Sequence, residues 1–244
     1  MRIGMDLRGA IFDVDGVLVA SPHEHAWREA LASYTDPKRF TTEFYQSYVA
    51  GKPRLDGARA TLKQLDVPNA SALAPEYAEK KQAIIDRLIA DGKFEAFPDA
   101  VRFAAALRAA GLLLALASSS KNADAMLKRL SLPDGRNLLS IFTADLSGCE
   151  VTKGKPDPEL FLLAAGALGM SPYECVVIED APAGIHAAKE GGMASVGIAR
   201  LHDDEILRSA DADLVVNSLD EVDVTALKSG ILRSHPAAER VGHA

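Results

Sequence analysis

The sequence contains little of what disulfide-stabilised, zinc-binding or membrane-spanning proteins depend on. It has only two cysteines, Cys149 and Cys175, and they form no short metal-binding pattern. Two isolated thiols exclude a disulfide scaffold and a zinc site, and we expect them to stay reduced in a cytoplasmic protein. The apolar run Gly9–Phe12 ends at Asp13, so it is too short for a signal peptide or a transmembrane helix.

An excess of positive charge is also absent. The 34 Asp and Glu residues outnumber the 27 Lys and Arg residues, which gives a formal net charge of −7. Such an acidic chain is not expected to bind nucleic acid or an anionic membrane over a broad surface. A small anionic substrate remains compatible, because a local pocket can be basic in an acidic protein. The sequence has no Walker-type glycine loop, which argues against a nucleotide-dependent ATPase.

What the sequence does contain is an alternation of short apolar runs and longer amphipathic stretches. This pattern is typical of an α/β fold with a Rossmann-like parallel sheet flanked by helices. Runs without polar residues, such as Leu112–Ala117 and Cys175–Ile178, predict strands that are buried on both faces. The predicted strands are Gly9–Phe12, Leu112–Ala117, Ser140–Thr143, Cys175–Ile178, Ala194–Ile198 and Leu214–Val216. The predicted helices are Asp99–Ala110, Asn122–Leu130, Pro158–Leu168 and Ala183–Glu190.

One long segment interrupts this alternation. From Ser21 to about Phe94 the sequence shows helical periodicity and turn signals, but no convincing strand. We therefore expect an α-helical insertion after the first strand, which forms a small cap domain over the sheet. The expected division is a catalytic core of residues 1–20 and 95–228, a cap of residues 21–94, and a polar tail of residues 229–244.

Polar residues follow the predicted strands at the point where each strand ends. Asp13-Val14-Asp15 follows the first strand, Ser118–Asn122 follows the second, and Glu179-Asp180 follows the strand at Cys175. A loop with Lys153 and Lys155 precedes a later helix. Ligands of open parallel sheets bind beyond the carboxyl ends of the strands, so these groups are expected to converge. Phosphoryl transfer needs this set: a nucleophile, a proton donor, oxygen ligands for a hard cation, and positive charge for the phosphoryl oxygens.

These motifs, in this order, resemble those of the haloacid dehalogenase superfamily of phosphotransferases. The matching residues are Asp13-x-Asp15-Gly16-Val17, Ser118 after a strand, Lys155-Pro156-x-Pro158 and Glu179-Asp180. Each motif alone is unspecific, but their combination is highly specific, and the resemblance extends from about Gly9 to Asp220. The run Ser118-x-Ser120-Lys121-Asn122 is most similar to β-phosphoglucomutase-like members.

The resemblance implies that Asp13 is a nucleophile that forms an aspartyl-phosphate. Asp15 would protonate the leaving oxygen and later activate water or an acceptor hydroxyl. Ser118 and Lys155 would bind the phosphoryl oxygens, although the serine could serve only as a helix cap and the lysine could be a solvated loop residue. Lys153 is close enough in sequence to be an alternative to Lys155. Members that dehalogenate lack an aspartate at the position of Asp15, so dehalogenation is disfavoured.

The resemblance also implies Mg²⁺ as the cofactor. The ion would be held by Asp13, by Asp180 and by the backbone carbonyl of Asp15. Glu179 would either bind the ion directly or contact the residues that bind it. The structural alternatives are an Asx-turn for the Asp-x-Asp pair and a favourable charge at a helix start for the Glu-Asp pair.

Further substrate contacts are expected from the cap. By resemblance, Arg54 and Lys81 would bind a non-reacting phosphate or take part in acid–base gating, although charges on cap helices are more often only part of the surface. His25 matches a cap-hinge histidine, but His23 stands at the expected distance before Trp27, so the assignment between the two is open. The family's acidic position after the first motif is Ala20 here. The full set of predicted substrate-binding residues is Gly51, Arg54, Lys81, Ser119, Ser120, Lys121, Asn122 and His25.

Together, these features predict a Mg²⁺-dependent phosphatase of a small phosphorylated metabolite, with a sugar phosphate as the expected substrate. A β-phosphoglucomutase-type phosphomutase is the alternative, because Arg54 and the serine-lysine-asparagine run fit a second phosphate. Hydrolysis is favoured because it requires only that water reach the aspartyl-phosphate. A non-catalytic binding protein on the same fold is disfavoured, since the catalytic residues are all present. We expect a monomer or a weak homodimer.

Overall fold

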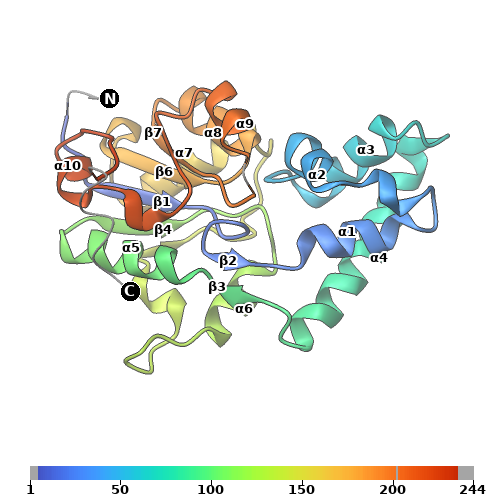
Figure 1. Ribbon diagram of the computed structural model, residues 1–244, viewed down its shortest axis with the longest axis horizontal. Coiled ribbons are helices and arrows are strands. Elements are labelled where there is room, and N and C mark those ends of the chain that lie inside the picture. Colours follow the sequence, from blue (N-terminus) through green and yellow to red (C-terminus); the bar gives the residue numbers. More distant parts are fainter. Residues whose placement is uncertain (1–4, 202, 236–244) are drawn as a thin grey trace.

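The computed structural model describes residues 5–201 and 203–235. A six-stranded sheet with parallel neighbours forms the centre of its larger part (Figure 1). The strand order is β5-β4-β1-β6-β7-β8, which confirms the predicted Rossmann-like parallel sheet. The strands are β1 (Gly9–Phe12), β4 (Leu113–Leu116), β5 (Ala144–Asp145), β6 (Cys175–Glu179), β7 (Ala194–Ile198) and β8 (Leu214–Val216).

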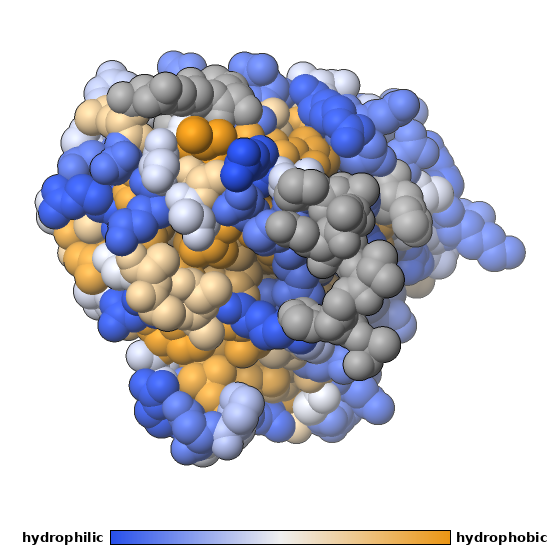
Figure 2. Space-filling model, turned by 60° about the vertical axis from the view of Figure 1, so that its left-hand side comes forward, coloured by the Kyte–Doolittle hydropathy of each residue, from blue (hydrophilic) through white to orange (hydrophobic). Residues whose placement is uncertain are grey.

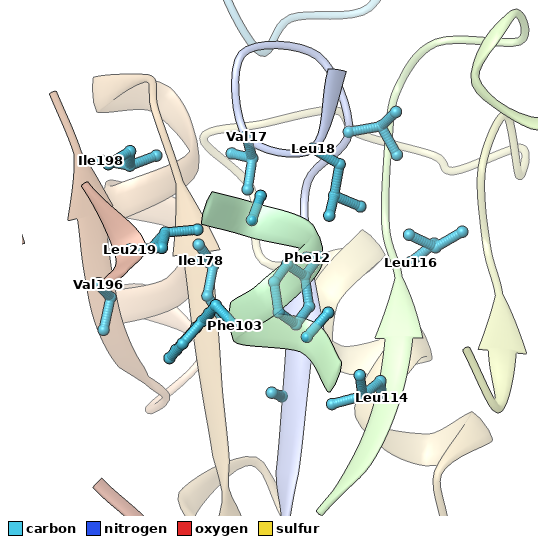
Figure 3. Packing of buried hydrophobic residues seen from close by; sticks show 14 of the residues in the cluster. Phe12, Val17, Leu18, Phe103, Leu114, Leu116, Ile178, Val196, Ile198 and Leu219 are labelled. Carbon is cyan, nitrogen blue, oxygen red and sulfur yellow. The ribbon is translucent and has the colours of Figure 1, made fainter. Parts of the chain in front are cut away.

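Successive residues of β1 point to opposite faces of the sheet. Phe12 belongs to the apolar cluster on the face of α5 and α6, whereas Ile11 belongs to the cluster beneath α7 and α8. Phe12 packs against Phe103 of α5, with ring centroids 6.1 Å apart (Figure 3). Burial on both faces explains why this strand has a continuous apolar sequence. The covering helices are α5 (Pro98–Ala109), α6 (Ala123–Arg129), α7 (Glu159–Ala167) and α8 (Pro182–Glu190), close to their predicted bounds.

The predicted strand at Ser140–Thr143 is wrong. Residues Leu138–Ile141 form a short 3-10 helix, η2, and β5 follows only at Ala144–Asp145. The side chain of Asn137 accepts a hydrogen bond of 3.1 Å from the Ser140 amide, which caps the helical turn. A short apolar run is compatible with either structure, and here the capping residue decides.

Several short elements were not predicted, because they contain too few residues for a periodic pattern. They are η1 (Pro37–Arg39), η3 (Pro172–Glu174), α9 (Asp204–Ser209), η4 (Leu219–Glu221) and α10 (Val224–Lys228). Within the described ranges, no helix combines the length and the apolar character that crossing a bilayer requires.

A helical unit follows β1 and lies to the right of the sheet in Figure 1. Two short antiparallel strands, β2 (Val19–Ala20) and β3 (Glu95–Ala96), pair where the chain leaves the sheet and where it returns. Between them lie α1 (His23–Leu31), α2 (Thr42–Tyr48), α3 (Arg54–Gln64) and α4 (Ala70–Ala90). These helices share an apolar cluster of their own around Trp27 and Tyr77. We call this unit the cap.

The start of the expected polar tail packs against the core. Leu232 is only 2 % exposed and belongs to the main apolar cluster, while Arg233 pairs with Asp223 at 2.7 Å. Ser234 forms an isolated antiparallel bridge with Val222. Figure 2 shows this end of the molecule, where hydrophobic residues lie between hydrophilic ones. The remaining tail residues, 236–244, lie outside the described residues.

Leu232→Ala tests this packing. We expect it to lower the free energy of unfolding by about 2–5 kcal/mol, because it removes a buried side chain and leaves a cavity. The matched control is Leu163→Ala on α7, where the side chain is 43 % exposed and the expected change is within about 0.5 kcal/mol. Urea titration of both variants measures the difference. Equal losses would contradict the packing of residues 229–235.

Candidate active site

A buried lysine between two carboxylates forms the centre of the site. The Lys155 side chain is fully buried, and its Nζ donates to Asp13 Oδ1 at 2.7 Å and to Glu179 Oε1 at 2.5 Å. Asp13 follows β1 and Glu179 ends β6, so the parallel pairing of these strands brings both carboxylates to one edge of the sheet. The ammonium group compensates negative charge that would otherwise be unfavourable to bury.

Glu179 is held by the backbone as well as by the lysine. Its Oε2 accepts hydrogen bonds of 2.9 Å from the amides of Asp180 and Ala181. A β-carbon at Gly184 of α8 would lie 1.8 Å from Oε1, so only glycine leaves room for this carboxylate. Glu179 is therefore placed to hold Lys155 in position.

Asp180 lies against the loop that follows β1. A β-carbon at Gly16 would stand 1.9 Å from Asp180 Oδ2, and Gly16 has a φ of +80°, which favours glycine for a second reason. Burial, together with the charges of Glu179 and Asp13, raises the pKa of Asp180 well above its usual value. Burial also raises the pKa of Asp13 to about 7; Lys155 opposes the rise, and Glu179 adds to it. Both aspartates therefore keep a proton to a higher pH than usual, because burial and the neighbouring carboxylates disfavour their ionised forms.

Asp15 contacts a histidine from the cap. His23 Nε2 lies 3.2 Å from Asp15 Oδ2, and His23 Nδ1 lies 2.5 Å from Nζ of Lys81 on α4. When Lys81 is charged its ammonium group can only donate, so Nδ1 is then the acceptor and Nε2 carries the proton that faces the carboxylate. Burial alone would raise the pKa of Asp15, but His23 holds it below its usual value. Burial lowers the pKa of His23, and it lowers that of Lys81 to about 7.

One cavity of about 470 Å³ connects these groups with the cap. Its wall combines residues from the loops after β1, β4 and β6 with residues from α1, α2, α3 and α4. The lining includes these predicted site residues: Asp13, Asp15, Gly51, Arg54, Lys81, Ser118, Ser119, Ser120, Lys121, Asn122 and Asp180. Lys155 and Glu179 lie behind Asp13 rather than in the wall.

The serine run after β4 forms a hydrogen-bonded turn at the edge of the cavity. The Ser118 hydroxyl accepts from the Ser120 amide, and the Ser120 hydroxyl accepts from the Asn122 amide, both at 3.2 Å. The Ser119 hydroxyl donates to the Gly51 carbonyl of the cap at 3.1 Å. The turn thus joins core and cap, and its short hydroxyl side chains face a region where phosphate oxygens would need donors.

The structure places the two candidates of each open assignment at different positions. His25, predicted to bind substrate, is 62 % exposed and pairs with Glu29, so it does not line the cavity. His23 lines the cavity instead. Lys153 is exposed beside Asp157, whereas Lys155 reaches Asp13. In both pairs a single residue separates the candidates, which is enough to direct them to different sides.

The cavity wall also contains residues that were not predicted, among them Trp27, Tyr45 and Gln82. Aromatic residues at helical spacing normally indicate core packing, so the sequence carried no signal for the first two. Gln82 follows Lys81 on α4. Its carboxamide accepts from Arg54 and donates to Asn122 Oδ1 at 3.1 Å, so it links the cap to the core.

The donor set fits Mg²⁺. In the described part of the chain no three His, Cys, Asp or Glu side chains make a metal cage by themselves. Magnesium, however, typically takes only one or two carboxylates, together with waters and substrate phosphate. Asp13 and Asp180 offer oxygen ligands, and a cation bound there would favour their ionised forms, which burial disfavours.

Comparison with known proteins places this arrangement in a family. A family model described as haloacid dehalogenase-like hydrolase matches residues 7–192. The chain belongs to this family, which confirms the resemblance found in the sequence.

The relatives include proteins that are named as phosphomutases and proteins that are named as phosphatases. β-Phosphoglucomutase of Mycobacterium bovis is 33 % identical over 248 residues, covering 88 % of this chain and 91 % of the relative. Validoxylamine A 7′-phosphate phosphatase of Streptomyces hygroscopicus subsp. limoneus is 30 % identical, covering 87 % and 94 %. The crystal structure of β-phosphoglucomutase from Pyrococcus sp. strain ST 04 aligns with a TM-score of 0.71 and 33 % identity, covering 90 % and 96 %.

A thermal-shift titration with Mg²⁺ tests the metal assignment. We expect Mg²⁺ to raise the Tm more at pH 8 than at pH 6. The pKa of Asp13 is raised to about 7, so below that pH the ion must displace a proton. The same shift makes the metal-free fold less stable as the pH rises from about 4 to about 7, because the folded state then holds the extra proton.

Two variants distinguish a metal ligand, Asp180, from a residue that supports Lys155, Glu179. Asp180→Asn should remove most of the Mg²⁺ response without lowering the metal-free Tm, because it relieves carboxylate repulsion. Glu179→Gln should lower the metal-free Tm, because Lys155 loses a charged partner. A wild-type Tm that is indifferent to Mg²⁺ at both pH values would contradict the metal assignment.

Proposed function

We propose that this protein is a Mg²⁺-dependent phosphatase that hydrolyses a small phosphorylated metabolite, with a sugar phosphate as the expected substrate, through an aspartyl-phosphate on Asp13. One observation carries the proposal: two aspartates line the same cavity in different surroundings. Asp13 is bound by a buried lysine, whereas Asp15 is bound by a histidine. A nucleophile and a proton-transfer group require such a difference.

In the first step, a carboxylate oxygen of Asp13 attacks phosphorus and the bond to the leaving oxygen breaks. Lys155 orients the nucleophile by holding Oδ1. The Ser118 hydroxyl lies at the same edge and is placed to donate to a phosphoryl oxygen. In the second step, water attacks the aspartyl-phosphate, which releases inorganic phosphate and restores the Asp13 carboxylate.

The proton for the leaving oxygen comes from Asp15, and the cap supplies it. Because the pKa of Asp15 is lowered, its carboxylate is ionised at rest and must first gain a proton. His23 can pass its Nε2 proton to Asp15 while it takes one from Lys81 at Nδ1. Lys81, with a pKa lowered to about 7, can release that proton near neutral pH. In the second step Asp15 takes a proton from the attacking water.

Mg²⁺, when bound, would neutralise charge between the phosphate and the carboxylates. Asp13, Asp180 and the backbone carbonyl of Asp15 would hold it. Glu179 already accepts from Lys155 and from two backbone amides, which suits a supporting position better than direct ligation.

A phosphomutase is the second candidate, because the same cavity offers a second anion-binding region. Arg54 and Asn122 line it and are linked through Gln82. A sugar bisphosphate could place one phosphate there and the other at Asp13. Several relatives bear the name β-phosphoglucomutase, which supports this candidate. Hydrolysis remains the proposal, since it requires only that water reach the aspartyl-phosphate.

Replacing the aspartates tests the chemistry. Asp13→Asn should lower turnover of phosphate esters by about 10³-fold or more, because an amide cannot form the acyl-phosphate. Asp15→Asn should lower turnover of alkyl phosphates by about 10²–10⁴-fold, and that of aryl phosphates less, because a good leaving group needs no proton. Phosphate release with Mg²⁺ present measures both. Near-normal rates for Asp13→Asn would disprove the proposed nucleophile.

Product analysis decides between hydrolysis and isomerisation. With β-glucose 1-phosphate and a trace of glucose 1,6-bisphosphate, a phosphatase releases inorganic phosphate from the start and does not respond to the bisphosphate. Arg54→Ala should then change hydrolysis of a small aryl phosphate little. If glucose 6-phosphate forms faster than phosphate, and Arg54→Ala abolishes this selectively, the mutase candidate replaces the phosphatase, because remote phosphate binding orients the reacting group.

A further inference from the structure

Arg200 is a nearly buried arginine that no sequence motif indicated. It follows β7, and its side chain is 13 % exposed. Its Nε donates to the Gly16 carbonyl at 3.3 Å and its Nη2 donates to the Val17 carbonyl at 3.0 Å. Its Nη1 donates to Asp99 Oδ2 at 2.7 Å. One guanidinium group thus binds a loop and a helix that are distant in the sequence.

The loop that Arg200 holds carries the groups of the proposed proton transfer. Gly16 and Val17 directly follow Asp15, and Gly16 is packed against the Asp180 carboxylate. Backbone bonds close the turn: the Gly16 amide donates to the Val19 carbonyl, and the Val19 amide donates to the Val14 carbonyl, both at 2.9 Å. A shift of this turn would therefore move Asp15 relative to Asp13.

The other side of the guanidinium group faces the chain as it returns from the cap. Its Cζ lies 3.9 Å from the centroid of the Phe97 ring, and the Phe97 amide donates to the Leu18 carbonyl at 2.9 Å. Asp99 is fixed in turn by the Leu219 amide at 2.8 Å and the Ser218 hydroxyl at 3.1 Å. Arg200 is thus braced against both the returning segment and the C-terminal part of the core.

We propose that Arg200 is a positioning residue for the reaction, because it fixes the turn after Asp15 against the segment that returns from the cap. This contact keeps the Asp15 carboxylate in place relative to Asp13. The proposal rests on the proposed function. Arg200 does not line the cavity, so it acts through the Gly16 and Val17 carbonyls and not on the substrate. Two carbonyls and a carboxylate require a planar, multi-donor fork, which a lysine cannot supply.

Arg200→Gln is the test, and Arg102→Gln is its matched control. Arg102 of α5 also makes a bidentate pair, with Asp220 beside the same C-terminal segment, but it does not touch the turn. We expect Arg200→Gln to lower kcat for an alkyl phosphate by about 10²-fold, as small displacements at a reacting centre do, and to affect 4-nitrophenyl phosphate much less. Arg102→Gln should change neither rate. Equal losses on both substrates for Arg200→Gln would overturn the proposal.

Hydrogen exchange provides a readout that does not need catalysis. The amides of Gly16, Leu18 and Val19 should exchange faster in Arg200→Gln than in the wild type, and unchanged in Arg102→Gln. If the wild type hydrolyses neither ester, the proposed function fails, yet faster exchange still supports the contact and unchanged exchange overturns it. If Arg200→Gln does not fold, Arg200→Lys gives the same comparison, with a smaller expected difference.

Discussion

The buried ammonium group of Lys155 is the interaction on which the site depends. Four carboxylates gather around one edge of the sheet, and burial, together with repulsion between neighbouring carboxylates, raises the pKa values of Asp13 and Asp180. Lys155 compensates Asp13 and Glu179 directly, at 2.7 and 2.5 Å. A hard divalent cation, and positively charged donors around a phosphate, would balance the remaining negative charge. The fold therefore tolerates a concentration of charge that is useful for binding.

The parallel order of the strands turns distant sequence positions into neighbours. Asp13 and Glu179 meet because β1 pairs with β6, and Arg200 reaches Gly16 and Val17 from the end of β7, the next strand along. The side chains at this edge are then supported from behind: Glu179 holds Lys155, and Asp99 holds Arg200. The residues that are proposed to react are thus held in place by residues that take no part in the reaction.

The sequence was informative where a side chain that can take part in catalysis stands at a recognisable position in the order of strands and helices. The positions of Asp13, Asp15, Ser118 and Asp180 at one edge of the sheet could be predicted because each follows a strand, and that of Lys155 because its loop precedes a helix. The helices of the core could be predicted from their periodicity. The choice between His23 and His25 could not be made, since residues two apart on a helix point to different sides and the entry of α1 decides which one faces the core. Arg200 could not be predicted either, because its partners come from two distant segments of the chain.

The proposed proton transfer requires that the cap contacts the core. Asp15 belongs to the core, whereas His23 and Lys81 belong to α1 and α4 of the cap. The path from Lys81 to Asp15 is therefore complete only while the cap lies against the sheet, as it does here, where the Ser119 hydroxyl also binds the Gly51 carbonyl. Under the proposed function, proton supply to the leaving group would accompany closure of the cavity. Catalysis would then depend on the contact between the two units.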